Sequence, residues 1–128
     1  MSYGFKKTVN RSVAEAEETV RSALQNHGFG VLTKIDMSEK FKEKLDVDFK
    51  SYVILGACNP SNAYAAVQAE EDIGLLLPCN VIIYQTGPQS TVSFVKPTVS
   101  MQMIENDRLK ALAEEVETKL YRAFEEIS

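Results

Sequence analysis

Residues 80–96 have the sequence NVIIYQTGPQSTVSFVK, which gives the strongest indication of the class of fold. An apolar run over Asn80–Thr86 is followed by the turn-forming residues Gly87-Pro88-Gln89-Ser90 and by a second apolar run over Thr91–Lys96. Glycine supplies backbone conformations that other residues avoid, and proline favours turn positions, so the pair is typical of a turn. The stretch therefore predicts a β-hairpin, which places two antiparallel strands side by side.

The sequence before the hairpin begins with a predicted strand, helix and second strand. Alternating side chains predict a strand over Ser2–Val9 and another over Phe29–Met37. Ser12 and Glu15 form a capping-box pattern that begins the helix between them. Gly28 ends this helix, because glycine adopts the left-handed conformation at no steric cost. The residues expected to face the core are Val13, Ala16, Val20, Ala23 and Leu24.

A short charged segment and a doubly apolar strand follow. Ser38 is the expected cap of a helix over Glu39–Leu45, whose only apolar residues are Phe41 and Leu45. So narrow an apolar stripe predicts a helix that lies on the surface or over a pocket mouth. Ser51–Cys58 is apolar on both faces. This pattern indicates a central strand covered on both sides, or a strand with one side covered by a partner subunit.

Two further helices are expected. Asn59-Pro60 reads as a helix cap followed by proline at the first helical position, and this helix runs to about Glu71. Pro97–Ile104 has no clear pattern, and the last helix begins at Asn106 or Asp107. Its apolar residues at helical spacing are Leu109, Leu112, Val116, Leu120, Phe124 and Ile127.

The resulting element order, β-α-β-α-β-α-β-β-α, predicts an α+β fold. We expect a two-layer sandwich, in which a mostly antiparallel sheet of about five strands packs against helices. A wholly parallel sheet is disfavoured, because no glycine-rich phosphate loop follows any predicted strand. The chain has 128 residues, so residues 1–128 are expected to form a single domain.

Composition and charge exclude several classes of partner. The net charge is −4 and is spread along the chain, so the basic face that a nucleic-acid-binding protein needs is absent. The same charge disfavours anionic membrane surfaces, and no apolar stretch approaches the roughly 18 residues that span a bilayer. The first residues lack the apolar run of a signal peptide, so we expect a cytoplasmic protein with free thiols.

The two cysteines lie in similar settings, Cys58-Asn59 and Cys79-Asn80, where an apolar run meets a turn residue. The helix after Cys58 carries the chain away by roughly 18 Å. The seven or so residues before Cys79 can return it over roughly 23 Å, so the two corners can meet. Together with the leucines of residues 75–77, among them Leu76, they predict a small pocket with few polar groups.

The sequence allows two interpretations of the thiol chemistry in this pocket. Cys58 precedes a helix N-terminus, which lowers a thiol pKa and favours a reactive thiolate. A buried cysteine, by contrast, acts as an inert small hydrophobic residue, and apolar surroundings raise its pKa. No metal site is expected, since His27 is the single histidine and suits a helix C-terminus, while a zinc site needs about four ligands. No motif names a cofactor.

The same residues resemble a known but uncharacterised prokaryotic family, the domain of unknown function number 302. The resemblance rests on two blocks, Leu55-Gly56-Ala57-Cys58-Asn59-Pro60 with Ala63, and Gly74-Leu75-Leu76-Leu77-Pro78-Cys79-Asn80-Val81. A weaker likeness extends over nearly the whole chain. The resemblance implies a small α+β fold assembled as a homodimer, and it implies no established activity.

Three functional hypotheses follow. The first is a homodimeric module that binds a small molecule in a pocket lined by Cys58, Asn59, Cys79, Asn80 and Leu76. The second is a thiol redox or sulfur-handling enzyme, in which Cys58 is the reactive thiolate and Cys79 the resolving partner. The third is a structural or oligomeric domain with inert cysteines. The sequence does not decide whether the chain is an enzyme.

Overall fold

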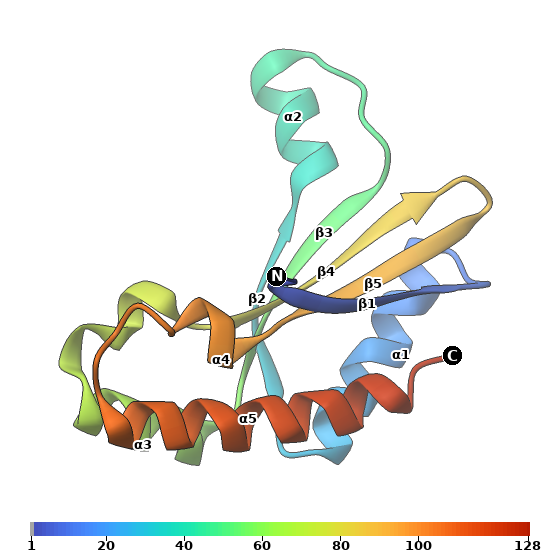
Figure 1. Cartoon of the computed structure of the whole chain (residues 1–128). Helices are drawn as coiled ribbons and strands as arrows, with labels where there is room; N and C mark the ends of the chain where they lie inside the picture. Colours follow the sequence, from blue (N-terminus) through green and yellow to red (C-terminus); the bar gives the residue numbers. More distant parts are fainter. Residues whose placement is uncertain (1) are drawn as a thin grey trace.

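The computed structural model describes residues 2–128 and contains one antiparallel sheet of five strands. The strand order is β1-β5-β4-β3-β2, and every neighbouring pair is antiparallel. Figure 1 shows the sheet with the long helix α5 running beneath it. The predicted α+β fold with a mostly antiparallel sheet is thus confirmed. The strands are β1 (Gly4–Val9), β2 (Gly30–Asp36), β3 (Tyr52–Cys58), β4 (Cys79–Thr86) and β5 (Gln89–Val95).

The predicted hairpin forms the middle of the sheet. Thr86 pairs with Gln89 across the two-residue turn Gly87-Pro88, and the register continues to Val81 opposite Phe94. Gly87 has φ of 58°, which explains why glycine opens the turn. The hairpin strand β4 is the central strand, and β3 lies one place from the edge.

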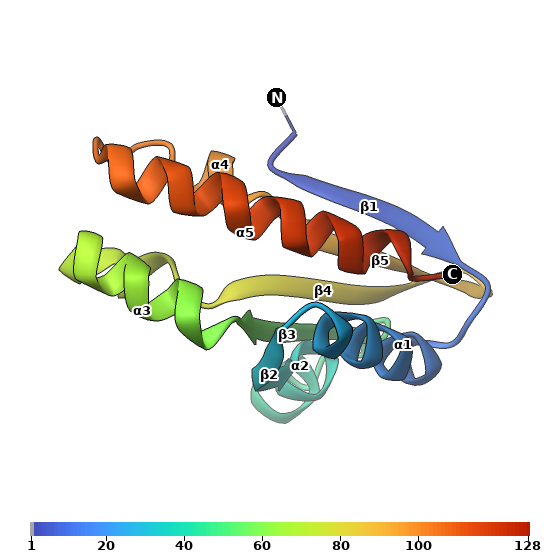
Figure 2. The same ribbon diagram turned by 90° about the horizontal axis from the view of Figure 1, so that it is seen from below.

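Helices cover one face of the sheet, and the first of them follows the predicted pattern closely. Helix α1 (Val13–Asn26) begins with a complete capping box between Ser12 and Glu15. The chain leaves it through Gly28, whose φ is 83°. Figure 2 shows α1 and α5 (Asp107–Glu125) on the same side of the strands. The buried residues of α1 are the five that the sequence predicts, Val13, Ala16, Val20, Ala23 and Leu24.

Helix α2 begins two residues earlier than the sequence suggests. It spans Met37–Leu45, and its cap is Asp36, whose carboxylate accepts a hydrogen bond from the backbone N–H of Glu39 at 3.0 Å. The hydroxyl of Ser38, the predicted cap, instead donates to Asp36 Oδ1 at 2.6 Å. Helix α2 buries no residue, and Figure 1 shows it standing beyond the sheet. We call residues 37–51 the α2 arm.

The remaining elements lie at the end of the molecule opposite the α2 arm. Helix α3 (Pro60–Ala69) ends earlier than predicted, and a 3-10 helix, η1 (Glu71–Leu76), continues it. The stretch without a clear sequence pattern begins with a short helix, α4 (Pro97–Ser100). Within the described part of the chain, no helix is long and apolar enough to cross a membrane.

The buried apolar residues form two separate clusters. The larger, which we call the sheet core, joins the covered face of the sheet to α1 and to the C-terminal half of α5. At its centre the rings of Phe5, Phe94 and Phe124 pack with centroids 5.0–5.6 Å apart. The smaller, which we call the outer cluster, lies among α3, η1, α4 and the N-terminal half of α5. It consists of Ala66, Ile73, Met101, Leu109 and Ala113.

Candidate functional site

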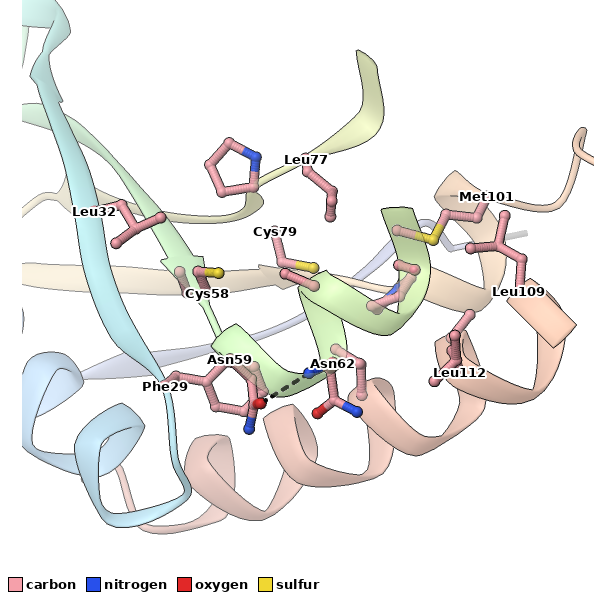
Figure 3. A pocket seen from close by; sticks show the side chains of 17 residues that line it. Phe29, Leu32, Cys58, Asn59, Asn62, Leu77, Cys79, Met101, Leu109 and Leu112 are labelled. Carbon is pink, nitrogen blue, oxygen red and sulfur yellow. Dashed lines mark hydrogen bonds between the residues drawn. The ribbon is translucent and has the colours of Figure 1, made fainter. Parts of the chain in front are cut away.

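A cavity of about 300 Å³ lies between the sheet core and the outer cluster. Figure 3 shows the side chains that surround it. The sheet contributes Ala57, Cys58 and Cys79 where β3 ends and β4 begins. Helices α3 and α5 form the facing walls, with Asn62, Ala63, Ala66, Leu109, Leu112, Ala113 and Val116.

The pairing of β3 with β4 brings the two Cys-Asn corners together. Ala57 is the register partner of Cys79, so Cys58 lies one residue beyond this pair at the same end of the sheet. Cys58, Asn59 and Cys79 all line the cavity. Figure 3 shows both sulfur atoms at its sheet side. After Cys58 the chain runs outward along α3 and returns through η1 to Cys79, as the length of the intervening chain allows.

Two residues predicted for the pocket do not line it. Asn80 pairs with Gly56 and is exposed, because alternation along β4 turns it to the face opposite Cys79. Leu76 packs against the outer cluster instead, and its neighbour Leu77 faces the cavity. The family-like leucine block therefore contributes one leucine to the lining rather than a continuous wall.

Burial raises the pKa of both thiols. The pKa of Cys79 rises to about 11, first because the thiol is removed from water and second because Cys58 lies nearby. Removal from water also raises the pKa of Cys58. This direction agrees with the second interpretation of the sequence, in which apolar surroundings raise the pKa of a cysteine. Both thiols are neutral near pH 7, and both are free.

The polar side chains of the lining already have structural roles. Asn59 Oδ1 accepts a hydrogen bond from the backbone N–H of Asn62 at 3.1 Å, which is the predicted helix cap. Asn62 is only 7% exposed and joins α3 to α5. Its Nδ2 donates to the carboxylate of Glu115, while its Oδ1 accepts from Lys119 Nζ at 2.9 Å. These contacts hold α3 over the cavity.

A close approach at the sheet end also depends on glycine. A Cβ placed on Gly56 would lie 2.5 Å from Cγ of Pro78 and 2.2 Å from Oγ1 of Thr33. Pro78 can therefore lie against β3 only because residue 56 has no side chain. This contact places Pro78 at the rim of the cavity beside Cys58.

Several residues that line the cavity are not predicted by the sequence. Met101 and the α5 residues Leu109, Leu112 and Val116 have the pattern of ordinary core positions, and nothing in the sequence separates a core residue from a cavity wall. Leu32 lines the cavity because β2 has a register irregularity between Val31 and Thr33. A bulge of this kind depends on strand pairing and leaves no sequence signal here.

Other candidate chemistry is absent from the described residues. Within residues 2–128 there is no group of three or more His, Cys, Asp and Glu side chains placed to hold a metal ion. His27, which lies outside the cavity lining, pairs with Glu126 at 2.7 Å. Across the same residues, every buried side-chain nitrogen or oxygen atom has a hydrogen-bond partner.

The fold and the site define a small α+β domain with an apolar cavity at one end of an antiparallel sheet. Residues 5–127 match the model of the family described as domain of unknown function DUF302, and the protein belongs to this family. It is similar to the uncharacterized conserved protein DUF302 from Bacillus stearothermophilus, whose crystal structure superposes with a TM-score of 0.92. The two chains are 29% identical, and the match covers 100% of each. A comparison with curated proteins found no match.

Proposed function

We propose that this protein is a homodimeric module that binds a small molecule in the cavity between the sheet core and the outer cluster. The cavity itself is the observation that carries the proposal. Other hollows on the described residues are as large or larger, but charged and polar side chains line them, whereas the walls of this cavity are almost entirely apolar. Small-molecule sites have such concave, mostly apolar walls.

The raised thiol pKa values favour binding over thiol chemistry. A reactive cysteine needs a thiolate near neutral pH, and both cysteines of this pocket favour the neutral form. The proximity of Cys58 to Cys79 is the one observation that favours the redox alternative. In the proposed module the two thiols act as polarizable, uncharged parts of the wall. Free thiols also fit the reducing cytoplasm, where we place this function.

The face of the sheet opposite the helices, which we call the open face, supports the homodimer. Ile35, Ile54 and Ile82 are register partners across β2, β3 and β4, and they form an apolar row on the face opposite the helices. Tyr52 and Tyr84 stack beside this row with ring centroids 5.6 Å apart. Ile35 is 43% exposed. The second apolar face of β3, recognised in the sequence, is therefore only partly covered within the described residues, by Phe49 near Tyr52 and by Lys50 over the Tyr84 ring.

The size of this face suits a second copy of the chain. A five-stranded sheet with strands of six to eight residues spans roughly 550 Å². A specific interface covers about 800 Å² on each partner. The adjoining α2 arm can supply the remainder, because Leu45, Val47 and Phe49 are 46–65% exposed.

Cavity filling tests the binding site. Ala63 lies in α3 and faces the cavity, whereas Ala111 is exposed on α5. Thermal-shift screening against a library of small apolar compounds is expected to find stabilising ligands for the wild type and for Ala111→Leu. Ala63→Leu is expected to abolish this stabilisation while the protein stays folded. Ligands that stabilise Ala63→Leu as well as the wild type would place binding elsewhere.

Charge placed on the open face tests the dimer. Ile35 and Val67 are both 43% exposed, but Val67 lies on α3, away from the open face. Light scattering at micromolar concentration is expected to give a dimer for the wild type and Val67→Glu, and a monomer for Ile35→Glu. A monomeric wild type would end the dimer proposal without affecting the cavity.

A further inference from the structure

We infer that the cavity selects an uncharged, mainly hydrocarbon ligand of about a dozen carbon atoms and rejects the corresponding carboxylate. This inference rests on the proposed binding function and specifies the ligand of the same site. It is carried by the size of the cavity, by the charges of its lining, and by the position of Leu32 at its mouth.

The size sets the number of atoms. An engineered apolar cavity of about 150 Å³ stays dry and holds one benzene molecule. The present cavity is about 300 Å³, which is about twice that space. It therefore suits roughly a dozen carbon atoms, arranged as a bicyclic aromatic or a medium-length chain.

The described lining has no cationic side chain that would pair with a negative charge. Among residues 2–128, no lysine, arginine or histidine lines the cavity. Lys119, the cation closest in the hydrogen-bond network, donates to Asn62 Oδ1 and lies 3.6 Å from Glu115. A carboxylate taken from water into this space would lack a cationic partner, and burial of an unpaired charge is strongly unfavourable.

The lining also offers few groups for hydrogen bonding. The side-chain oxygens of Asn59 and Asn62 accept bonds that hold α3 in place. Proline at the first position of α3 removes one N–H from the helix start, and Asn59 occupies the N–H of Asn62. The remaining polar groups of the lining side chains are the amide nitrogen of Asn59, which lies beside Gly28, and the two thiols, which are weak donors. A mainly hydrocarbon molecule loses least on entering such a site.

Leu32 shows where an apolar ligand enters. It is 67% exposed although it is a large aliphatic residue, and the irregularity of β2 turns it to the cavity. Bulges next to binding sites commonly re-aim a side chain in this way. Leu32 lies at the rim with Cys58 and Pro78, both of which are half-buried. An apolar mouth favours an apolar molecule from the first contact.

Matched probes test the charge of the ligand. 2-Ethylnaphthalene, 2-acetylnaphthalene and 2-naphthoate have nearly the same size and differ in polarity and charge; 2-decanone and decanoate form a flexible pair. Calorimetry or displacement of a fluorescent probe is expected to show binding of the neutral members, with each carboxylate weaker by about a hundred-fold. Carboxylates that bind as tightly as their neutral partners would overturn the inference.

A variant that introduces charge makes the test reciprocal. Leu112 faces the cavity from α5 and is half-buried, so Leu112→Lys can place its ammonium at the lining. This variant is expected to bind 2-naphthoate at least ten-fold more tightly than the wild type does. Arg108→Lys on the exposed side of α5 is the control and should leave the preference unchanged. A Leu112→Lys protein that folds, judged by circular dichroism, yet gains no carboxylate affinity would also count against the inference.

The outcomes separate the two proposals. If no probe binds the wild type and Ala63→Leu changes nothing, the binding function itself fails. If carboxylates bind in the cavity and Ala63→Leu abolishes their binding, the binding function stands and the inference about ligand charge fails. If Leu32→Ser binds the neutral probes more weakly than the wild type, Leu32 lies at the entrance of the cavity. Unchanged binding would contradict that role of Leu32.

Discussion

The sheet core and the outer cluster both include residues of the long helix α5, but they are built from different side chains. The C-terminal half of α5 meets aromatic rings, and Phe5, Phe94 and Phe124 fill the space between helix and sheet. The N-terminal half meets α3, whose inward residues are small, such as Ala63 and Ala66. Large rings close the first region, and alanines leave the second region open. Both regions are apolar, so the size of the side chains distinguishes the end of this protein that keeps a cavity.

A pair of leucine substitutions gives the largest expected effect. Leu120 and Leu109 both lie on α5, with exposures of 0% and 1%, so helix propensity and burial are matched. Leu120 belongs to the sheet core, while Leu109 lines the cavity. We expect Leu120→Ala to lower the free energy of unfolding by about 4 kcal/mol and Leu109→Ala by about 2.5 kcal/mol, measured by urea denaturation. Equal costs would mean that the outer cluster is packed as tightly as the sheet core.

The next largest effect concerns the rates at which the two thiols are alkylated. A thiol with a pKa of about 11 has a thiolate fraction at neutral pH about 300-fold smaller than that of a free cysteine at about 8.5. We expect alkylation of Cys79, followed in Cys58→Ser, to be slower by up to this factor, because the variant keeps the burial of Cys79 and loses the smaller effect of Cys58. Cys58, followed in Cys79→Ser, should react faster than Cys79 and more slowly than a free cysteine. Rates equal to that of free cysteine at neutral pH would revive the redox alternative.

The same raised pKa fixes the sign of a pH effect on stability. The folded protein keeps Cys79 neutral while the unfolded chain ionises it. This contribution to stability is fully present below the unfolded value of about 8.5 and is lost as pH rises toward about 11. Denaturation midpoints should therefore fall across this range, and Cys79→Ala should reduce the fall.

Removing the N-terminal cap of α3 is expected to have a smaller effect on the free energy of unfolding. Asn59 Oδ1 accepts from the N–H of Asn62 and begins the helix that covers the cavity. Asn59→Ala is expected to lower the free energy of unfolding by about 1 kcal/mol, whereas Asn59→Asp should change it by a few tenths, since aspartate caps equally well. A loss for Asn59→Asp as large as that for Asn59→Ala would show that the side-chain amide has a role beyond capping.

The smallest effect lies outside both clusters, at the base of the α2 arm. The hydroxyl of Ser38 and then the N–H of Glu39 hydrogen-bond to Asp36 and lower its pKa. The stabilisation is present above the unfolded value of about 3.9 and is lost as pH falls through the lower folded value. Asp36→Asn keeps a cap and removes this titration, so its stability should depend slightly less on pH in the acid range. Identical acid profiles would assign no part of that dependence to the arm.

The sequence predicted the elements that depend on local patterns. The capping box at Ser12, the glycine exit at Gly28, the Asn59-Pro60 helix start and the hairpin around Gly87 are all present. Each has its signal within a few neighbouring residues, because caps and turns are short-range structures. The cap of α2 was misplaced, since Asp36 and Ser38 are both good caps and the end of β2 decides between them.

The site was predicted less completely. The meeting of Cys58 and Cys79 could be anticipated from chain reach, but the face on which Asn80 lies required the register of β4 against β3. A one-residue difference in strand alternation reverses the direction of a side chain. The cavity also depends on α5, which lies more than thirty residues along the chain from Cys58 and has no pattern that marks Leu109 or Leu112 as its wall.

Local sequence patterns were enough to predict the α+β class, the succession of the strands and main helices along the chain, and the two family-like corners that carry the cysteines, but not η1, α4 or the order of strands in the sheet. The packing of distant elements places Cys58, Asn59 and Cys79 on one apolar cavity and leaves Asn80 and Leu76 outside its lining. The physical reason is the range of the interactions. Capping, alternation and turns act over a few residues, whereas a cavity is the space left among side chains of distant elements, and burial there sets the charge state of the thiols.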